Sequence, residues 1–218
     1  MNTSDTFLSG KLVDENGLPP LKAHYNLITE GIFRGRYGFI CVQEDRIGPD
    51  GTFVSPSLPP GKYFVRFFGI LQNPASPPES RVSQSRVFDV IYPNAETVSK
   101  GSRFELQSGE TAHSVFQVSN PTWFDVAGRI IGNPPVSYES LCIMFQRDMG
   151  ILHEVGGEGF SISADGGFQG TLQKGLYFVS LHEMTLSDPH GYVRSIRQFG
   201  STTVKIEHDT RDLEIPLN

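Results

Sequence analysis

Hydrophobic residues alternate with polar or small ones in short runs along this chain, as expected for β-strands that bury one face. A period of two places each second side chain of a strand on the same face. Two runs show this pattern most clearly: Tyr63, Val65 and Phe67, and Tyr177, Val179 and Leu181. We predict that these six residues lie in hydrophobic cores.

The same pattern predicts many short strands separated by turns that contain Gly, Pro, Asn or Asp. In the first half we expect strands at 7–13, 22–30, 37–43, 52–54, 63–67, 87–91 and 114–118. In the second half we expect them at 124–131, 140–146, 159–163, 176–182, 192–198, 202–207 and 211–217. Residues 72–85, rich in Pro and Ser, predict a long exposed loop, and residues 119–122 predict a linker. No long helix is expected.

The two halves repeat one order of turns and strands. Three features recur, namely a glycine in the first strand (Gly10, Gly128), an Asp-Gly turn (Asp50-Gly51, Asp165-Gly166) and a glycine before the aromatic strand (Gly61, Gly175). The spacing between the first two glycines is 41 residues from Gly10 to Gly51 and 38 from Gly128 to Gly166. The sequence therefore contains an internal repeat, and we predict that Phe53 matches Phe168 and that Tyr63 matches Tyr177.

Composition supports an all-β protein and excludes some partners. The 218 residues include 23 Gly, 15 Pro, 16 Phe and 7 Tyr, which gives many turns between β-favouring aromatic residues. The formal charge of −6 is spread along the chain without Lys/Arg clusters, so nucleic acid is not an expected partner. No apolar run approaches the roughly 20 residues of a membrane-spanning helix, and residues 1–6 lack the pattern of a signal peptide.

The turn motifs resemble those of the carboxypeptidase regulatory-like domain. They are G-x-L-V-D-x-x-G-x-P at Gly10–Pro19, D-G-x-F at Asp50–Phe53 and L-P-P-G-x-Y at Leu58–Tyr63. The second half keeps Asp165, Gly166, Phe168, Gly175 and Tyr177 but has other turns elsewhere.

This resemblance implies two tandem antiparallel Greek-key β-sandwiches of transthyretin-like or Ig-like type. We expect one at residues 1–119 and the other at residues 120–218. Members of the family are typically non-catalytic modules of larger exported bacterial proteins, attached to peptidases, outer-membrane receptors or adhesins.

Catalytic and cofactor motifs are not found. None of the six histidines has Glu three residues later, as a carboxypeptidase zinc site would require. The pairs His153-Glu154 and His182-Glu183, with His190, are interpreted as loop residues and not as a metal site. Residues 14–17 lack the acidic pattern of a calcium loop, and no phosphate loop or G-x-S-x-G motif occurs. We predict no enzyme activity, no metal and no cofactor.

Four other residues invite an interpretation. Trp123 is our candidate ligand residue, as a stacking platform for sugar, although core or interdomain packing is the more frequent role of a large aromatic residue. Cys41 and Cys142 are expected to be buried free thiols. Lys11 in the first strand could form an isopeptide bond with Asn120, which follows the last strand of the first copy. The second copy has Arg129 in the place of Lys11, and a protonated guanidinium cannot act as the nucleophile, so no isopeptide bond is expected.

Together with the missing catalytic motifs, the resemblance implies a non-catalytic binding or spacer part of an exported bacterial protein, located outside the cell, in the periplasm or at the outer membrane. Interaction is expected through edge strands or through loops such as 72–85 and 185–191. Partners would be other modules of a longer parent chain, or protein or glycan, without nucleic acid or membrane insertion. The alternative is a carbohydrate-binding module of a secreted hydrolase or outer-membrane receptor.

Overall fold

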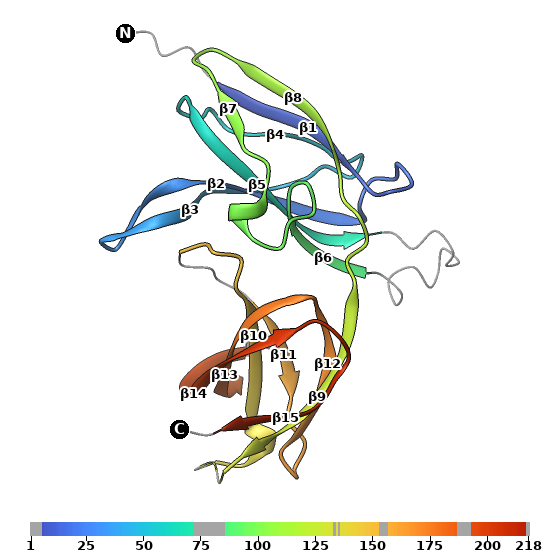
Figure 1. The fold of residues 1–218 in the computed structure, drawn as a ribbon, viewed down its shortest axis with the longest axis vertical. Helices are drawn as coiled ribbons and strands as arrows, with labels where there is room; N and C mark the ends of the chain where they lie inside the picture. Colours follow the sequence, from blue (N-terminus) through green and yellow to red (C-terminus); the bar gives the residue numbers. More distant parts are fainter. Residues whose placement is uncertain are drawn as a thin grey trace. The chain divides into compact units, whose positions relative to one another are not determined.

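A computed structural model describes residues 6–71, 86–132, 134, 136–152, 157–186 and 193–216. The chain divides into two compact units (Figure 1). Unit 1 comprises Met1–Pro121 with Met149–Glu154, and unit 2 comprises Thr122–Asp148 and Val155–Asn218. Strands make up 66% of the structure, and the described residues contain only two single-turn 3-10 helices, η2 (Val98–Lys100) and η3 (Tyr138–Ser140), so the predicted all-β fold class is confirmed. The assignment of residues 1–119 and 120–218 to two family domains stays a prediction.

Unit 1 is a sandwich of two sheets. One sheet has the order β4 (Thr52–Val54), β1 (Phe7–Val13), β8 (Thr111–Gln117). The other has the order β3 (Arg36–Arg46), β2 (Lys22–Phe33), β5 (Gly61–Leu71), β6 (Arg86–Ile91), and β7 (Phe104–Leu106) also pairs with β5. Tyr63, Val65 and Phe67 are at most 5% exposed in the core between the sheets, as predicted. A second cluster of this unit buries Ile28, Phe64, Ile91, Val98 and Met149.

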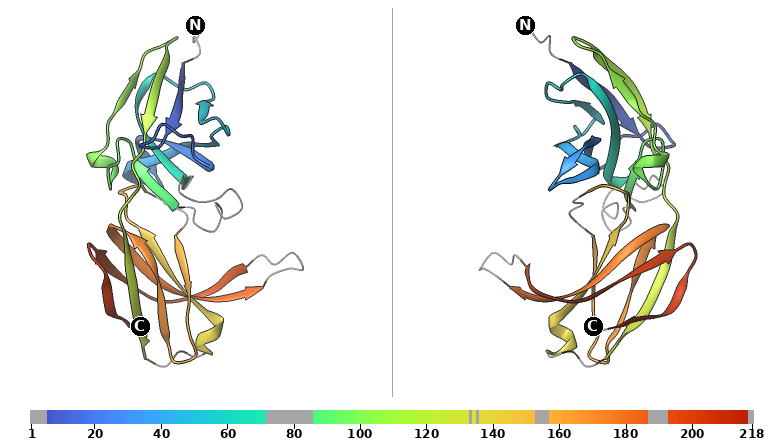
Figure 2. Two further views of the ribbon diagram at one scale, coloured as in Figure 1. Left: turned by 90° about the vertical axis from the view of Figure 1, so that its right-hand side faces the viewer. Right: turned by 60° about the vertical axis from the view of Figure 1, so that its left-hand side comes forward.

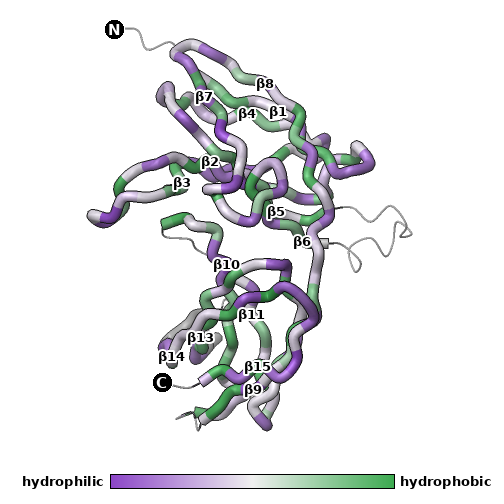
Figure 3. Tube along the Cα trace, viewed as in Figure 1, coloured by the Kyte–Doolittle hydropathy of each residue, from purple (hydrophilic) through white to green (hydrophobic). Residues whose placement is uncertain are grey.

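Unit 2 repeats this plan. One sheet has the order β12 (Gly167–Gln173), β9 (Trp123–Ile131), β15 (Thr210–Pro216). The other has the order β11 (Glu158–Ser161), β10 (Leu141–Arg147), β13 (Gly175–Leu186), β14 (Val193–Ile206). Tyr177, Val179 and Leu181 are at most 3% exposed, which confirms their predicted core position. Figure 3 shows the alternation of hydrophobic and hydrophilic residues along the strands of both units.

Two strand predictions in unit 2 were wrong. Residues 167–173 form β12, for which no strand was expected, because Gly167 and Gly170 dilute the alternation. The two strands expected at 192–198 and 202–207 are one strand, β14, with Gly200 at φ 60° as an extra residue between Phe199 and Ser201. Such a β-bulge bends a strand without ending it, and β13 and β14 form a long curved ribbon in Figure 2.

The pairing confirms the internal repeat. Gly10 lies opposite Phe53 in β1 and β4, and Gly128 lies opposite Phe168 in β9 and β12. In each unit the first strand also pairs with the last strand in parallel, β1 with β8 and β9 with β15, whereas the other strand pairs are antiparallel. The hydroxyl groups of Tyr63 and Tyr177 each donate a 2.8 Å hydrogen bond to the carbonyl four residues earlier.

The repeated glycine in the first strand is required by a close approach of the neighbouring chain. A Cβ atom on Gly128 would lie 2.2 Å from the carbonyl oxygen of Leu213 in β15 and 2.7 Å from the ring of Phe168. A Cβ atom on Gly10 would lie 2.4 Å from the carbonyl oxygen of Ser114 in β8 and 2.6 Å from the ring of Phe116. Any side chain here would push the parallel strand and the core ring away.

Candidate functional site

Unit 2 contains an open groove, which we call the unit 2 groove, with a volume of about 1140 Å³. This is slightly above the range of about 300–1,000 Å³ that is usual for ligand pockets. The groove extends over β9, β11, β12, β15 and the turn before β12. Its lining residues are Ala127, Gly128, Arg129, Gly159, Phe160, Ser161, Ile162, Ser163, Asp165, Gly167, Phe168, Gln169, Arg211, Asp212 and Glu214.

A β-bulge in β15 positions two of the charged side chains. Thr210 pairs with Val126 and Leu213 with Gly128, so Arg211 and Asp212 both lie opposite one residue of β9. Asp212 has φ 65°, in the left-handed region that Asp tolerates better than most residues. Bulges of this kind redirect side chains, and both residues are exposed at the groove.

The groove carries charges of both signs. In the part of the chain that the structure describes, the side chains of Arg211, Asp212 and Glu214 form no hydrogen bond or ion pair. Arg129 also faces the groove, where its charge acts on Asp165. The side chains of Arg211, Asp212 and Glu214 are thus available to a ligand that carries positive and negative charges.

Asp165 has a structural role in the turn that precedes β12. Its Oδ1 accepts hydrogen bonds from Ser163 Oγ at 2.6 Å and from the Gly167 amide at 3.2 Å. The Ser163 hydrogen bond, followed by that of Gly167 and the charge of Arg129, lowers the pKa of Asp165 below its ordinary value. The carboxylate is therefore ionised at neutral pH and held in the turn. In unit 1, Asp50 makes the equivalent hydrogen bonds to the amide and hydroxyl groups of Thr52, and its pKa is lowered as well.

Aromatic rings form the apolar part of the groove. Phe160 in β11 packs so closely over β12 that a Cβ atom on Gly170 would lie 2.5 Å from its ring. The Phe145 ring packs against Phe160 and Phe168, with ring centres 5.2 Å and 5.9 Å apart respectively. The groove wall is thus anchored in the core of unit 2 and gives the charged residues a fixed support.

The structure does not bring Trp123 to this groove. Trp123 begins β9 opposite Gln173 and is half-buried, and its indole Nε1 is buried without a hydrogen-bond partner among the described residues. Sequence reasoning missed Arg211, Asp212 and Glu214. The available signal was the pair of adjacent charged residues Arg211 and Asp212 in the last strand, because two charged neighbours interrupt the alternation of hydrophobic and polar residues.

Other predicted residues are placed as follows. Cys41 and Cys142 are free thiols, but the prediction that both are buried was wrong: Cys41 is exposed on the edge strand β3 and Cys142 is half-buried in β10. Lys11 is exposed in β1. The interpretation of His182 and Glu183 as loop residues was wrong, because both lie in β13. His153, Glu154, His190, the whole loop 72–85 and most of the loop 185–191 lie outside the described residues.

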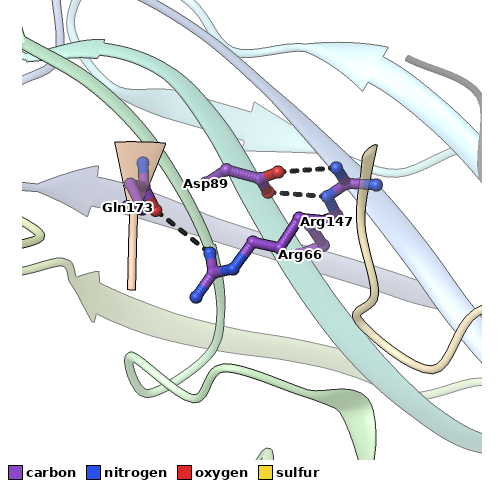
Figure 4. A network of polar contacts seen from close by, with 4 residues as sticks. All are labelled: Arg66, Asp89, Arg147 and Gln173. Carbon is purple, nitrogen blue, oxygen red and sulfur yellow. Dashed lines mark hydrogen bonds and ion pairs between the residues drawn. The ribbon is translucent and has the colours of Figure 1, made fainter. Parts of the chain in front are cut away.

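Two further polar contacts belong to the separate units (Figure 4). In unit 1, the Arg66 guanidinium donates two hydrogen bonds of 2.7 Å to the Asp89 carboxylate. In unit 2, Arg147 Nη1 donates to Gln173 Oε1 at 3.0 Å. Within the described ranges, no group of three His, Cys, Asp or Glu side chains is placed to hold a metal ion. No helix among the described residues is long and apolar enough to cross a membrane.

No family model matches the chain, and no curated protein matches it. Among solved structures, the chain is similar to a leucine-rich repeat protein of Bacteroides thetaiotaomicron (12% identity, TM-score 0.33, covering 99% of this chain and 26% of that one). It is also similar to a streptococcal ancillary pilin (13% identity, TM-score 0.37, covering 100% of this chain and 64% of that one). A third similar structure is a fimbrial anchor protein of Porphyromonas gingivalis (11% identity, TM-score 0.29, covering 90% of this chain and 81% of that one). The chain spans about a quarter of the first protein and just under two thirds of the second. At these scores we draw no functional conclusion from them.

Proposed function

We propose that this chain is a non-catalytic pair of β-sandwich modules of an exported bacterial protein, and that the unit 2 groove binds a polypeptide segment of a partner. The observation that carries this proposal is the groove itself, with charged side chains of both signs on rigid strands. Export and membership of a longer chain rest on the family resemblance of the turn motifs.

A polypeptide fits the groove for two reasons. Arg211, Asp212 and Glu214 line the groove from β15 and match a ligand that carries both charges, and such complementarity gives specificity and orientation. The half-buried ring of Phe160 adds an apolar surface for aliphatic side chains.

The chemistry of the groove supports binding and not catalysis. The described lining residues include neither histidine nor cysteine. The hydroxyl of Ser163 is hydrogen-bonded to Asp165 within the turn, and the Asp165 carboxylate is held ionised there. An ionised carboxylate cannot serve as a general acid.

The test is selection from a displayed library of random peptides against the intact chain, followed by fluorescence anisotropy of the selected peptides. We expect Arg211→Glu to weaken the selected peptides at least tenfold, because the change places a third negative charge beside Asp212 and Glu214. The matched control is Arg36→Glu on the exposed strand β3 of unit 1, which should leave affinity unchanged. A library that yields no binder, or binders that tolerate Arg211→Glu, would refute the groove as the site and favour the spacer role.

The carbohydrate-binding alternative keeps Trp123 as its proposed ligand residue. Its ring is only half-buried at the first position of β9, which leaves part of it accessible for stacking. Glycan-array binding that is lost in Trp123→Ala would support this alternative.

A further inference from the structure

The larger sheet of unit 2 aligns nine side chains on the face that points away from the core. Its register places three rows across β10, β13 and β14: Gln146, Phe178 and Thr203; Met144, Ser180 and Ser201; and Cys142, His182 and Gln198. The alternate residues Ile143, Phe145, Val179, Leu181 and Phe199 are buried in the core, so the nine lie on the opposite face. We call this surface the outer face of unit 2.

The bulge at Gly200 keeps the third row on this face. Ser201 pairs with Ser180, and Phe199 pairs with Leu181, so Gly200 is one extra residue. Without it, alternation from Ser201 would turn Gln198 toward the core. With it, Gln198 faces the same side as Ser201 and Thr203, and all three are exposed.

An exposed aromatic ring lies in the first row. Phe178 is 51% exposed, although its neighbours in β13, Tyr177 and Val179, are at most 3% exposed. Leu176, the preceding residue on the same face, is 42% exposed. Phe178 and Leu176 thus form a shared exposed apolar patch on this face, and apolar patches bordered by polar side chains mark contact surfaces.

The polar side chains of these three rows are neutral; the next residue of β14 on this face, Lys205, lies opposite Leu176 and forms an ion pair with Glu207. None of the nine residues is Asp, Glu, Lys or Arg, although these types make up 19% of the chain. Ser180 Oγ and His182 Nε2 are hydrogen-bonded at 2.8 Å. Desolvation lowers the pKa of His182, so its imidazole is neutral at pH 7. Three hydroxyls, two amides and this imidazole can each both donate and accept hydrogen bonds.

We propose that the outer face of unit 2 binds a neutral oligosaccharide. The ring of Phe178 packs on the apolar C–H face of one sugar, and the hydroxyl, amide and imidazole groups of the adjacent rows bind its hydroxyls. Rows two residues apart are about 6.6 Å from each other, so the three rows span about 13 Å, enough for more than one sugar ring.

Other ligand classes fit this surface less well. An anionic ligand would find no Arg or Lys in the three rows, and Lys205 beyond them is ion-paired with Glu207. The core of a protein interface would be more apolar. A neutral sugar chain matches because it offers hydroxyls on its edges and an apolar face. This site is separate from the unit 2 groove and does not depend on the polypeptide proposed there.

The test is isothermal titration of the whole chain with neutral hexasaccharides of glucose, mannose, galactose, xylose and N-acetylglucosamine, and with an oligogalacturonate as the acidic comparison. We expect at least one neutral hexasaccharide to bind and the acidic one not to bind. Phe178→Ala should weaken binding at least tenfold. Tyr37→Ala removes an aromatic residue that is 70% exposed in unit 1 and should have no effect.

A second variant guards against a loss that comes from misfolding. Thr203 is exposed, so Thr203→Asp should leave the melting temperature unchanged while its charge abolishes binding. Arg211→Glu in the groove should leave sugar binding intact, which separates the two proposals. Absence of binding by every neutral hexasaccharide at millimolar concentration, or binding that survives both Phe178→Ala and Thr203→Asp, would overturn this site.

Discussion

Replacing Gly128 by alanine tests whether the parallel strand β15 depends on close approach to β9. The added Cβ would lie 2.2 Å from the Leu213 carbonyl oxygen, whereas a comfortable C···O contact is about 3.3 Å. Strand β15 must therefore move by about 1 Å, which strains its hydrogen bonds to β9 and displaces Phe168. Overpacking of this kind lowers the free energy of unfolding by about 1–3 kcal/mol. The replacement of glycine also makes the unfolded chain less flexible, which raises the free energy of unfolding by about 0.4–1 kcal/mol.

The net expectation is that Gly128→Ala lowers the free energy of unfolding of unit 2 by about 1–2 kcal/mol. Trp123 is the single tryptophan of the chain and lies in unit 2, so its fluorescence during urea denaturation reports on that unit. Gly10→Ala makes the same clash in unit 1 and should shift the circular-dichroism transition.

The matched control is Gly61→Ala in β5. Its Cβ would have no neighbour closer than 3.5 Å, and its backbone is not in the left-handed region, so stability should not fall. If the tryptophan transition of Gly128→Ala coincides with that of the wild type within 0.5 kcal/mol, roughly the error of such a comparison, the close-approach argument fails.

Four other measurements test the interior and the charges. Val65→Asp or Val179→Asp should destabilise its own unit by more than about 3 kcal/mol, because an unpaired charge enters a core position that is 0% exposed, and an unchanged denaturation curve would contradict this. Tyr177→Phe should cost about 1 kcal/mol through loss of its hydrogen bond to the Gln173 carbonyl, measured by denaturation against wild type. Because the folded state lowers the pKa of His182, the unfolded chain takes up the proton first as pH falls through about 6.5, so stability should decrease below that pH, and less so in His182→Gln. Intact-mass spectrometry should show no loss of ammonia from a Lys11 cross-link; a mass lower by one ammonia would contradict the expectation.

The sequence predicted the cores because their cause is local. Alternation over five residues decides which side of a strand is apolar, and Tyr63 and Tyr177 follow their turns at a fixed distance. Both tyrosines accordingly make the same hydrogen bond four residues back. The parallel pairing of β1 with β8 and of β9 with β15 was not predicted, because partners that lie far apart in the sequence, such as Phe7 with Thr111 and Val126 with Thr210, leave no local pattern.

Both proposed binding surfaces depend on β-bulges, and this explains why the sequence alone did not show them. A bulge adds one residue and thereby reverses the face of every residue beyond it. In a sequence this looks like the end of a strand, so β14 was divided at Gly200 and the exposed row that includes Gln198 was lost. In β15, a regular strand would have one residue between those that pair with Val126 and Gly128. The bulge puts two charged residues there, Arg211 and Asp212. Since core packing fixes the remaining positions of these strands, the bulges are where unit 2 directs polar side chains outward without altering its core.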